Sequence, residues 1–177
     1  MNQFSPLTWF YCLDYSTILL LVFFGSFIWT GLVPTVISRT VFRRFNLFLI
    51  LIWIAMVLYM TLYNRDRVIY PVELIPFHSY REAATTGNVE LYRSNLMNMV
   101  LFYPIGLFLL CASGRIQKAA ILSVLIGLSL SIFIEWCQYR FMLGRPEIDD
   151  ILHNTLGALF GATVPPVTFR LLGKGSL

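Results

Sequence analysis

The chain has 177 residues, of which 58% are hydrophobic and only 12% are charged. Soluble domains carry about 25% charged residues, so this composition excludes an ordinary water-soluble domain and indicates one that a bilayer solvates. The net charge of +4 does not indicate nucleic-acid binding, because the Lys and Arg residues lie between apolar runs and form no basic block.

Five apolar runs follow one another along the chain, each near the roughly 20 residues that a helix needs to cross the hydrocarbon core. They cover residues 16–37, 45–63, 96–112, 119–138 and 151–172. We therefore expect an all-α fold, a polytopic transmembrane helical bundle of five spans that forms a single integral membrane domain over residues 1–177. Pro104 lies in the middle of the third run and predicts a kink there.

The one long connector, residues 64–95, separates the second span from the third. Its stretch VIYPVELIPFHSY is too apolar and aromatic for a solvated loop. We therefore expect an interfacial or re-entrant segment between spans two and three.

Short connectors rich in arginine and lysine predict the orientation in the membrane. The residues before the first run contain no Lys or Arg, which favours an N-terminus outside. The C-terminus is then cytoplasmic, and so are the basic residues Arg39, Arg43, Arg44, Arg115, Lys118, Arg170 and Lys174. The chain is therefore predicted to be a multi-pass membrane protein.

With five spans, the connector 64–95 and the connector 139–145 emerge on the same side, whichever way the chain is inserted. Polar residues flank both connectors and can therefore meet at one membrane face. They are Arg93, Asn95 and Asn98 at the third span, Glu135 and Gln138 at the end of the fourth, and Arg145, Asp149, Asp150, His153 and Asn154 around the start of the fifth.

Glu135 is the most informative of these residues, because an acidic side chain inside or beside the hydrocarbon is costly and marks a functional site by default. Arg145, Arg93 and His153 are its candidate partners. Structural alternatives stay open for the others. Asp149 and Asp150 also suit a helix N-terminus, Arg93 and Arg145 also suit interfacial anchors, and Asn98 also suits a helix–helix hydrogen bond.

The polar and glycine motifs together resemble those of the VanZ-like family. The resemblance covers residues 73–161 and rests on Asn98-x-x-x-Phe102-x-Pro104-x-Gly106, Ile134-Glu135-x-x-Gln138, Gly144-Arg145 and Asp150-x-x-x-Asn154-x-x-Gly157-x-x-x-Gly161, preceded by Leu74-Ile75-Pro76-Phe77. It implies that Asn98, Glu135, Gln138, Arg145, Asp150 and Asn154 are site residues. Pro76, Phe102, Pro104, Gly106, Gly157 and Gly161 are then shaping residues. VanZ-like proteins are bacterial membrane proteins named for a member associated with low-level resistance to teicoplanin, a lipoglycopeptide. The resemblance therefore implies a location in the bacterial cytoplasmic membrane.

The leading functional hypothesis is a binding role at the outer face of the membrane. The polar cluster would hold a lipid headgroup, a lipid-linked cell-wall precursor or a lipoglycopeptide, with Arg93 and Arg145 suited to phosphate or carboxylate groups. Asp149 would also contribute to binding. Membrane lipids are the expected partners, and no metal or cofactor is expected.

Two rival functions stay open. In an intramembrane acid/base or metal-dependent enzyme, Glu135, Asp150 and His153 would be the catalytic groups. No nucleophile or zinc motif supports this reading. In a small lipid transporter or flippase, the buried carboxylates would serve transport, although no internal repeat is visible.

Overall fold

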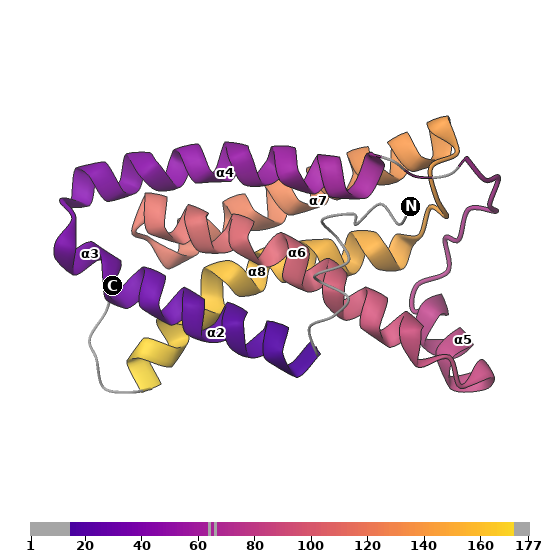
Figure 1. The fold of residues 1–177 in the computed structure, drawn as a ribbon, viewed down its shortest axis with the longest axis horizontal. Coiled ribbons are helices and arrows are strands. Elements are labelled where there is room, and N and C mark those ends of the chain that lie inside the picture. The colour runs from indigo at the N-terminus through magenta and orange to yellow at the C-terminus, as the bar shows by residue number, and fades with distance from the viewer. Residues whose placement is uncertain (1–14, 64, 66, 172–177) are drawn as a thin grey trace, which may run out of the picture.

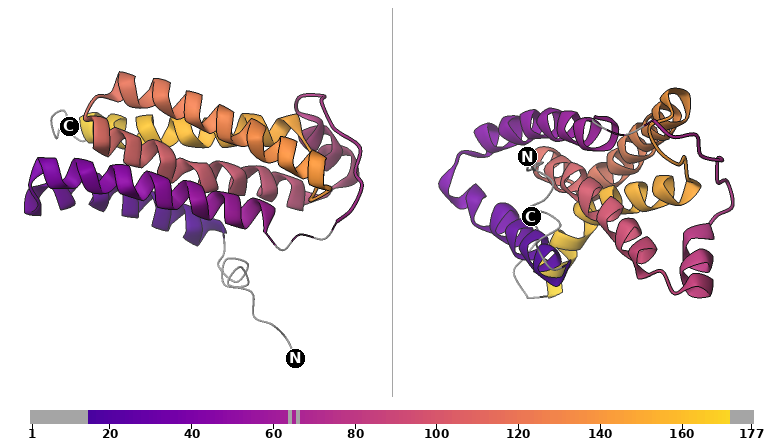
Figure 2. Two further views of the ribbon diagram at one scale, coloured as in Figure 1. Left: turned by 90° about the horizontal axis from the view of Figure 1, so that it is seen from above. Right: turned by 45° about the vertical axis from the view of Figure 1, so that its right-hand side comes forward.

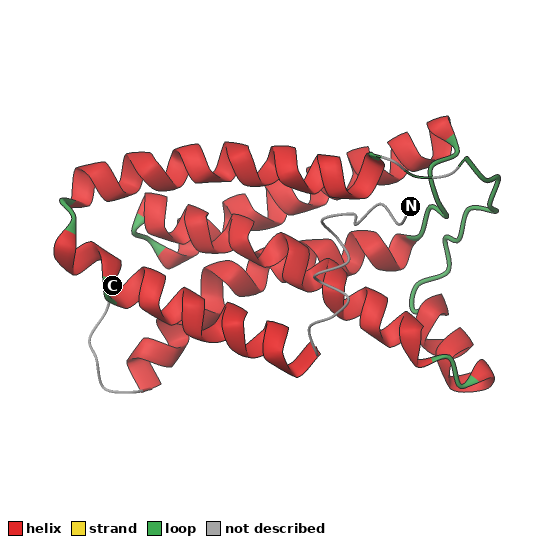
Figure 3. Ribbon diagram, in the orientation of Figure 1, coloured by secondary structure: helices red, strands yellow, loops and turns green. Residues whose placement is uncertain are grey.

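The computed structural model describes residues 15–63, 65 and 67–171. In that part of the chain all regular structure is helical (Figure 3). One isolated bridge joins Glu73 to Glu147. The helices are α2 (Tyr15–Gly31), α3 (Val33–Val36), α4 (Arg39–Leu62), α5 (His78–Thr86), α6 (Val89–Ser113), α7 (Ile116–Phe141) and α8 (Ile148–Leu171). The prediction of an all-α helical bundle is confirmed.

The long helices run between the two ends of an elongated bundle (Figure 1). In the described chain, four segments are long and apolar enough to cross a membrane: Thr17–Val36, Arg39–Leu62, Val89–Ser113 and Ile116–Phe141. The fifth predicted span corresponds to α8, which lies alongside the others but is less apolar. Asp149 and Asp150 occupy its first turn, and Pro165 and Pro166 lie within it. The chain is therefore a multi-pass membrane protein, and its described residues contain four such helices where five were predicted.

Several helices extend beyond the apolar runs that predicted them, because a capping residue marks their true start. The Ser38 hydroxyl accepts a hydrogen bond from the Val41 amide at the start of α4. The Asn88 side chain accepts one from the Glu90 amide at the start of α6, 3.1 Å away. Such N-caps stabilise a polar first turn that hydropathy alone cannot detect.

Helix α6 lies at the centre of the bundle and contacts α2, α4, α5, α7 and α8. Its closest approach is to α8, where glycines let the two backbones touch. A β-carbon at Gly106 would overlap the Ala158 carbonyl, one at Gly157 the Met99 carbonyl, and one at Gly161 the Tyr103 carbonyl. Small residues at a membrane helix interface allow this close packing. Phe102, fully buried, fills the core beside them.

Pro104 lies inside α6, where it removes one backbone donor. Helix α4 supplies a hydrogen bond nearby, since the Trp53 indole donates to the Leu101 carbonyl over 2.9 Å. The bond ties α4 to α6 at the turn that the proline weakens.

The two ends of the bundle differ in composition. The acidic end comprises residue 65, residues 67–95 and residues 135–150, and the basic end comprises residues 37–44 and 113–118 (Figures 1 and 2). Between the ends, many large apolar side chains of α2 and α4 are exposed, among them Leu21 at 61% and Leu51 at 68%. An apolar surface of this kind is solvated by lipid. Lys174, one of the residues used to predict orientation, lies outside the described residues.

Candidate functional site

The long connector covers the acidic end of the bundle by pairing with the connector between α7 and α8. The Val68 amide donates to the Met142 carbonyl and the Glu73 amide donates to the Pro146 carbonyl, both over 2.9 Å. The Ile148 amide donates to the Glu73 carbonyl over 3.0 Å. Three backbone bonds thus hold segment 67–77 across the ends of α7 and α8, and α5 follows it at the same end (Figure 2).

Glu135 and Asp150 form a pair of interacting carboxylates beneath this connector. Glu135, only 7% exposed, accepts a hydrogen bond from the Glu147 amide at 2.9 Å. Asp150 accepts one from the Asn98 side chain at 2.7 Å, which ties α8 to α6. The two carboxylates lie close enough to interact electrostatically with each other. The spacing of the motifs predicted that these side chains would share one face, and the structure brings them together.

Arg65 is the cation that accompanies the pair, and the sequence pattern did not single it out. Its charge interacts with both Glu135 and Asp150. Its guanidinium passes beside Gly144, where a β-carbon would lie 3.0 Å from Nη1. A glycine at position 144 therefore leaves room for the arginine. The sequence did contain one indication of this role, because Arg65 lies at the start of the connector 64–95, which span parity places at this face.

Arg145 and Arg93, expected as partners of Glu135, pair with other carboxylates. The Arg145 guanidinium lies 3.3 Å from Glu147, 3.5 Å from Glu82 and 3.6 Å from Glu73. Arg93 pairs with Glu90 at 2.7 Å on the exposed start of α6. The physical reason is competition, because the connector supplies carboxylates that lie nearer to these arginines than Glu135 does.

Glu147 links Arg145 to Glu135, since its amide donates a hydrogen bond to Glu135 and its carboxylate pairs with Arg145. Burial raises the pKa of the Glu147 carboxyl above its ordinary value, and the Arg145 guanidinium opposes that shift. A carboxyl that loses hydration and has a single close cation favours its neutral form more than an exposed glutamate does.

Asp149 anchors α5 to α8 and is 1% exposed. Its carboxylate accepts hydrogen bonds from the Phe77 amide, the Ser79 amide and the Ser79 hydroxyl. Asn95 completes the group by donating to the Ser79 hydroxyl at 2.9 Å. Asp149 therefore caps the start of α5, a helix that is distant in sequence, in addition to lying in the first turn of its own helix. Three bonds leave this carboxylate little capacity for a ligand.

His153 is buried one turn further along α8 and has both ring nitrogens engaged. Nε2 lies 2.7 Å from the Tyr80 hydroxyl, and Nδ1 lies within hydrogen-bond distance of the Asp149 carbonyl. The ring therefore belongs to the attachment of α5. The three groups proposed for catalysis are split in the structure, with Glu135 and Asp150 together and His153 engaged with α5.

Two amides complete the site. The buried Asn154 donates to the Ser131 hydroxyl at 2.9 Å and so joins α8 to α7, while its Oδ1 has no hydrogen-bond partner among the described residues. The Gln138 side chain, one turn beyond Glu135, is buried and lies 3.7 Å from the position of a β-carbon at Gly144. Pro76, in the connector, contributes its carbonyl, which accepts a hydrogen bond from Arg81 at 3.1 Å.

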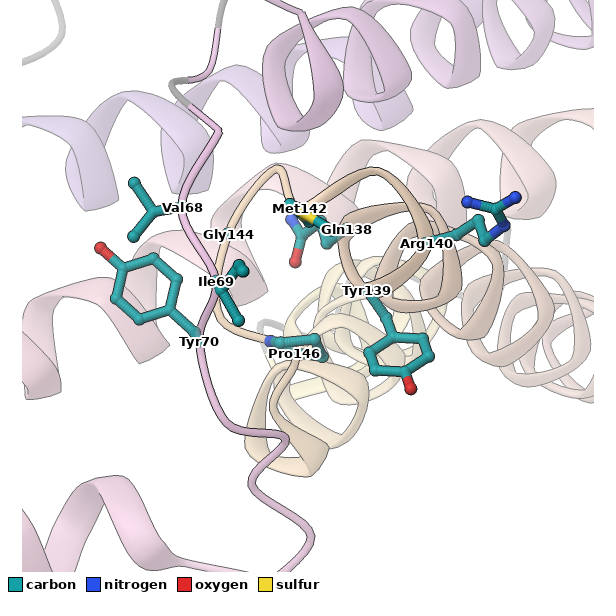
Figure 4. Close-up of a pocket in the computed structure, with 9 residues that line it drawn as sticks. All are labelled: Val68, Ile69, Tyr70, Gln138, Tyr139, Arg140, Met142, Gly144 and Pro146. Atoms are coloured by element: carbon teal, nitrogen blue, oxygen red, sulfur yellow. The ribbon is translucent and has the colours of Figure 1, made fainter.

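A pocket of about 350 Å³ opens beside this cluster, between segment 68–70 and the end of α7 (Figure 4). Gln138, Gly144 and Pro146 line it from the α7–α8 side, and Tyr70 and Arg140 lie on opposite sides of it. In the described chain, no group of three or more His, Cys, Asp or Glu residues has the arrangement of a metal site. The pocket thus offers amide, guanidinium and aromatic groups beside buried carboxylates.

Comparison with known proteins identifies the family. The model of the VanZ/LLP1 family matches residues 45–169, which is most of the chain and includes every site residue described above. No curated protein matches, and no solved structure matches.

Proposed function

Because the chain belongs to the VanZ/LLP1 family, we propose that it contributes to low-level teicoplanin resistance by binding a lipid-linked ligand at the acidic end of the bundle. A lipid-linked cell-wall precursor and the lipoglycopeptide itself are the ligand classes that fit. The observation that carries the proposal is the pocket of about 350 Å³ lined by Gln138, Arg140 and Gly144, where Gln138 follows Glu135 by one helical turn and Gly144 lies beside Arg65.

The charge around the pocket favours a ligand rich in hydroxyl or amino groups. Arg140 lines the pocket itself. In and beside the pocket, Arg65, Arg140 and Arg145 are outnumbered by five carboxylates, those of Glu73, Glu82, Glu135, Glu147 and Asp150. Carboxylates accept hydrogen bonds and repel phosphate, so sugar hydroxyls and ammonium groups are better partners here than a phosphate. The earlier expectation of phosphate recognition by Arg145 is therefore weakened, since three carboxylates already surround that arginine.

The pocket also suits a ligand held by an acyl chain. Val68, Ile69 and Met142 supply apolar walls, and the exposed apolar flanks of the helices begin directly below. A ligand anchored in the bilayer would reach this opening from the membrane side, with its polar part against Gln138 and Arg140. Binding of this kind would lower the amount of free ligand at the membrane surface.

We further propose that the acidic end faces outward, as the ligand classes require. The basic end carries Arg39, Arg43, Arg44, Arg115 and Lys118, and clusters of this kind in short connectors favour the cytoplasmic side. Labelling of single cysteines introduced at the exposed positions Ala84 and Gln117 with a membrane-impermeant reagent tests this orientation. Labelling of position 117 alone in intact cells would show the opposite orientation.

The test of function uses a teicoplanin-susceptible host that depends on this protein for protection. Glu135→Gln removes the charge while an oxygen stays available to the Glu147 amide, and Gln138→Ala opens the pocket wall. Each variant should return the host to the sensitivity it shows without the protein. Gln117→Ala, an exposed glutamine on the same helix at the basic end, is the matched control and should protect fully.

Membrane abundance is measured for all three variants by quantitative immunoblotting. Full protection by Glu135→Gln and Gln138→Ala at normal abundance would refute the proposal.

The rival function, an intramembrane acid/base enzyme, has one observation in its favour. Glu135 and Asp150 are adjacent carboxyl groups, as in many general acid/base pairs. The engaged nitrogens of His153 remove the third proposed catalytic group. Incubation of the purified protein with membrane lipid extracts distinguishes the two functions. A lipid product that forms with the native chain and disappears with Asp150→Asn would favour the enzyme.

A further inference from the structure

A second pocket, of about 540 Å³, lies at the basic end of the bundle among α2, α3, α4 and α6, far from the site described above. Three arginines line it, Arg39 and Arg43 from the start of α4 and Arg115 from the start of α7. Its remaining wall is largely apolar and includes Phe42, Leu110 and Cys111. A cavity that joins clustered guanidinium groups to an apolar wall is suited to an amphiphilic anion.

Among the described residues, no acidic side chain balances these arginines. The sequence contains no Asp or Glu in residues 15–65, 91–134 or 151–177, so every connector at the basic end lacks a carboxylate. Among the described residues, no ion pair involves Arg39, Arg43 or Arg115. Positive charge without a protein counter-charge attracts an external anion.

One of the three arginines is held in place. Arg43 Nε donates a 2.6 Å hydrogen bond to the Ala112 carbonyl in the last turn of α6. That bond uses one donor of the guanidinium and leaves its other four available. Arg39 and Arg115 are exposed on either side and complete the charged rim.

We propose that this pocket binds the phosphate headgroup of an anionic phospholipid. A guanidinium matches the geometry of phosphate oxygens, and basic pockets between membrane helices at this interface bind acidic headgroups. The exposed side chains of Leu32, Val36 and Val41 beside the pocket provide the surface on which acyl chains would lie. The apolar flank favours a lipid over a soluble phosphate.

The experiment is native mass spectrometry of the full-length protein, purified in detergent, with phosphatidylglycerol or phosphatidylcholine added. The native chain should retain phosphatidylglycerol in preference to phosphatidylcholine. Arg39→Gln and Arg115→Gln should each weaken phosphatidylglycerol binding about fivefold, the contribution of one basic residue at an anionic surface. Arg44→Gln removes a charge from the same end without altering the pocket lining, so it is the matched control and should leave binding unchanged.

A third arm adds inorganic phosphate in excess. If phosphate displaces phosphatidylglycerol completely, the pocket recognises a soluble anion and the lipid proposal is overturned. Equal retention of phosphatidylcholine, or an equal loss with Arg44→Gln, would overturn it as well. Size-exclusion profiles verify that each variant is folded. The measurement is independent of the proposed function, because Glu135→Gln at the acidic end should not change it.

Discussion

The glycines between α6 and α8 give the sharpest test of how the bundle is packed. A β-carbon at Gly157 would overlap the Met99 carbonyl oxygen and would lie 2.7 Å from both the carbonyl carbon and Cα of Met99. All three atoms are backbone, so no side-chain rotation can relieve the contact and the helices must move apart. Gly25 in α2 is the matched control, since a β-carbon there meets nothing within 4 Å.

The expected changes in unfolding free energy follow from two opposing effects. Replacing a helical glycine by alanine stabilises the helix by about 1 kcal/mol. Overpacking a close interface costs about 1–3 kcal/mol, and the upper value applies where backbone atoms collide. Gly157→Ala should therefore lose about 2 kcal/mol of unfolding free energy, while Gly25→Ala should lose none. For a chain of this size the loss corresponds to a fall in Tm of about 4–8 °C.

Thermal unfolding of detergent-purified protein, followed by near-UV circular dichroism, measures both variants. Met99 follows Asn98 in α6, and Gly157 lies in the same helix as Asp150. The same experiment therefore also tests the helix packing that holds Asn98 and Asp150 together. An unchanged Tm for Gly157→Ala would refute the close approach of α6 and α8. An equal fall for Gly25→Ala would show that the effect is not one of packing.

Two further predictions concern the acidic end. Asp149→Asn replaces the acceptor of three hydrogen bonds at the start of α5, so the amides of His78–Thr86 should exchange with deuterium about tenfold faster. Asp150→Asn is the control. Equally fast exchange of these amides in Asp150→Asn would contradict the role of Asp149 as the cap of α5. Burial raises the pKa of Glu147, so its folded state binds protons more tightly than its unfolded state, and its contribution to stability falls as pH rises above the ordinary glutamate value. Glu147→Gln should therefore be more stable relative to the native chain at pH 8 than at pH 4 in chemical denaturation, and the opposite trend would refute the assignment.

The helical bundle and the face that gathers its polar residues were predictable because both follow from repeated local signals. Hydropathy locates the apolar runs, and span parity places the two polar connectors on the same side without knowledge of packing. The sequence left a helix–helix hydrogen bond open for Asn98 without naming its partner, and the structure gives Asp150 as that partner. Element boundaries were less predictable, because the Asn88 cap lies outside the apolar run.

The partners of the charged groups could not be predicted for a different reason. Arg65, Glu73, Ser79 and Glu82 all belong to the long connector, whose path depends on backbone bonds to the α7–α8 turn. Sequence spacing contains no information about that path. The prediction of five spans fell short at α8 because its first turn carries Asp149 and Asp150, and because His153 and two prolines lower its hydropathy further. The polar groups are accommodated by α5 and α6, since Asp149 and His153 bind α5 and Asp150 binds Asn98.

The uneven distribution of acidic residues connects the two proposed sites. The nine Asp and Glu residues lie in positions 14, 66–90 and 135–150, while the basic end has none. A phosphate that approaches the acidic end meets seven carboxylates beside six arginines, whereas the charged residues of the basic end are all arginine or lysine. The two proposals are therefore consistent with each other, because they assign phosphate recognition to the basic end and hydrogen-bond-donating ligands to the acidic end. The same asymmetry supports the proposed orientation, because a leaflet with anionic headgroups would attract the end whose described residues carry no negative charge.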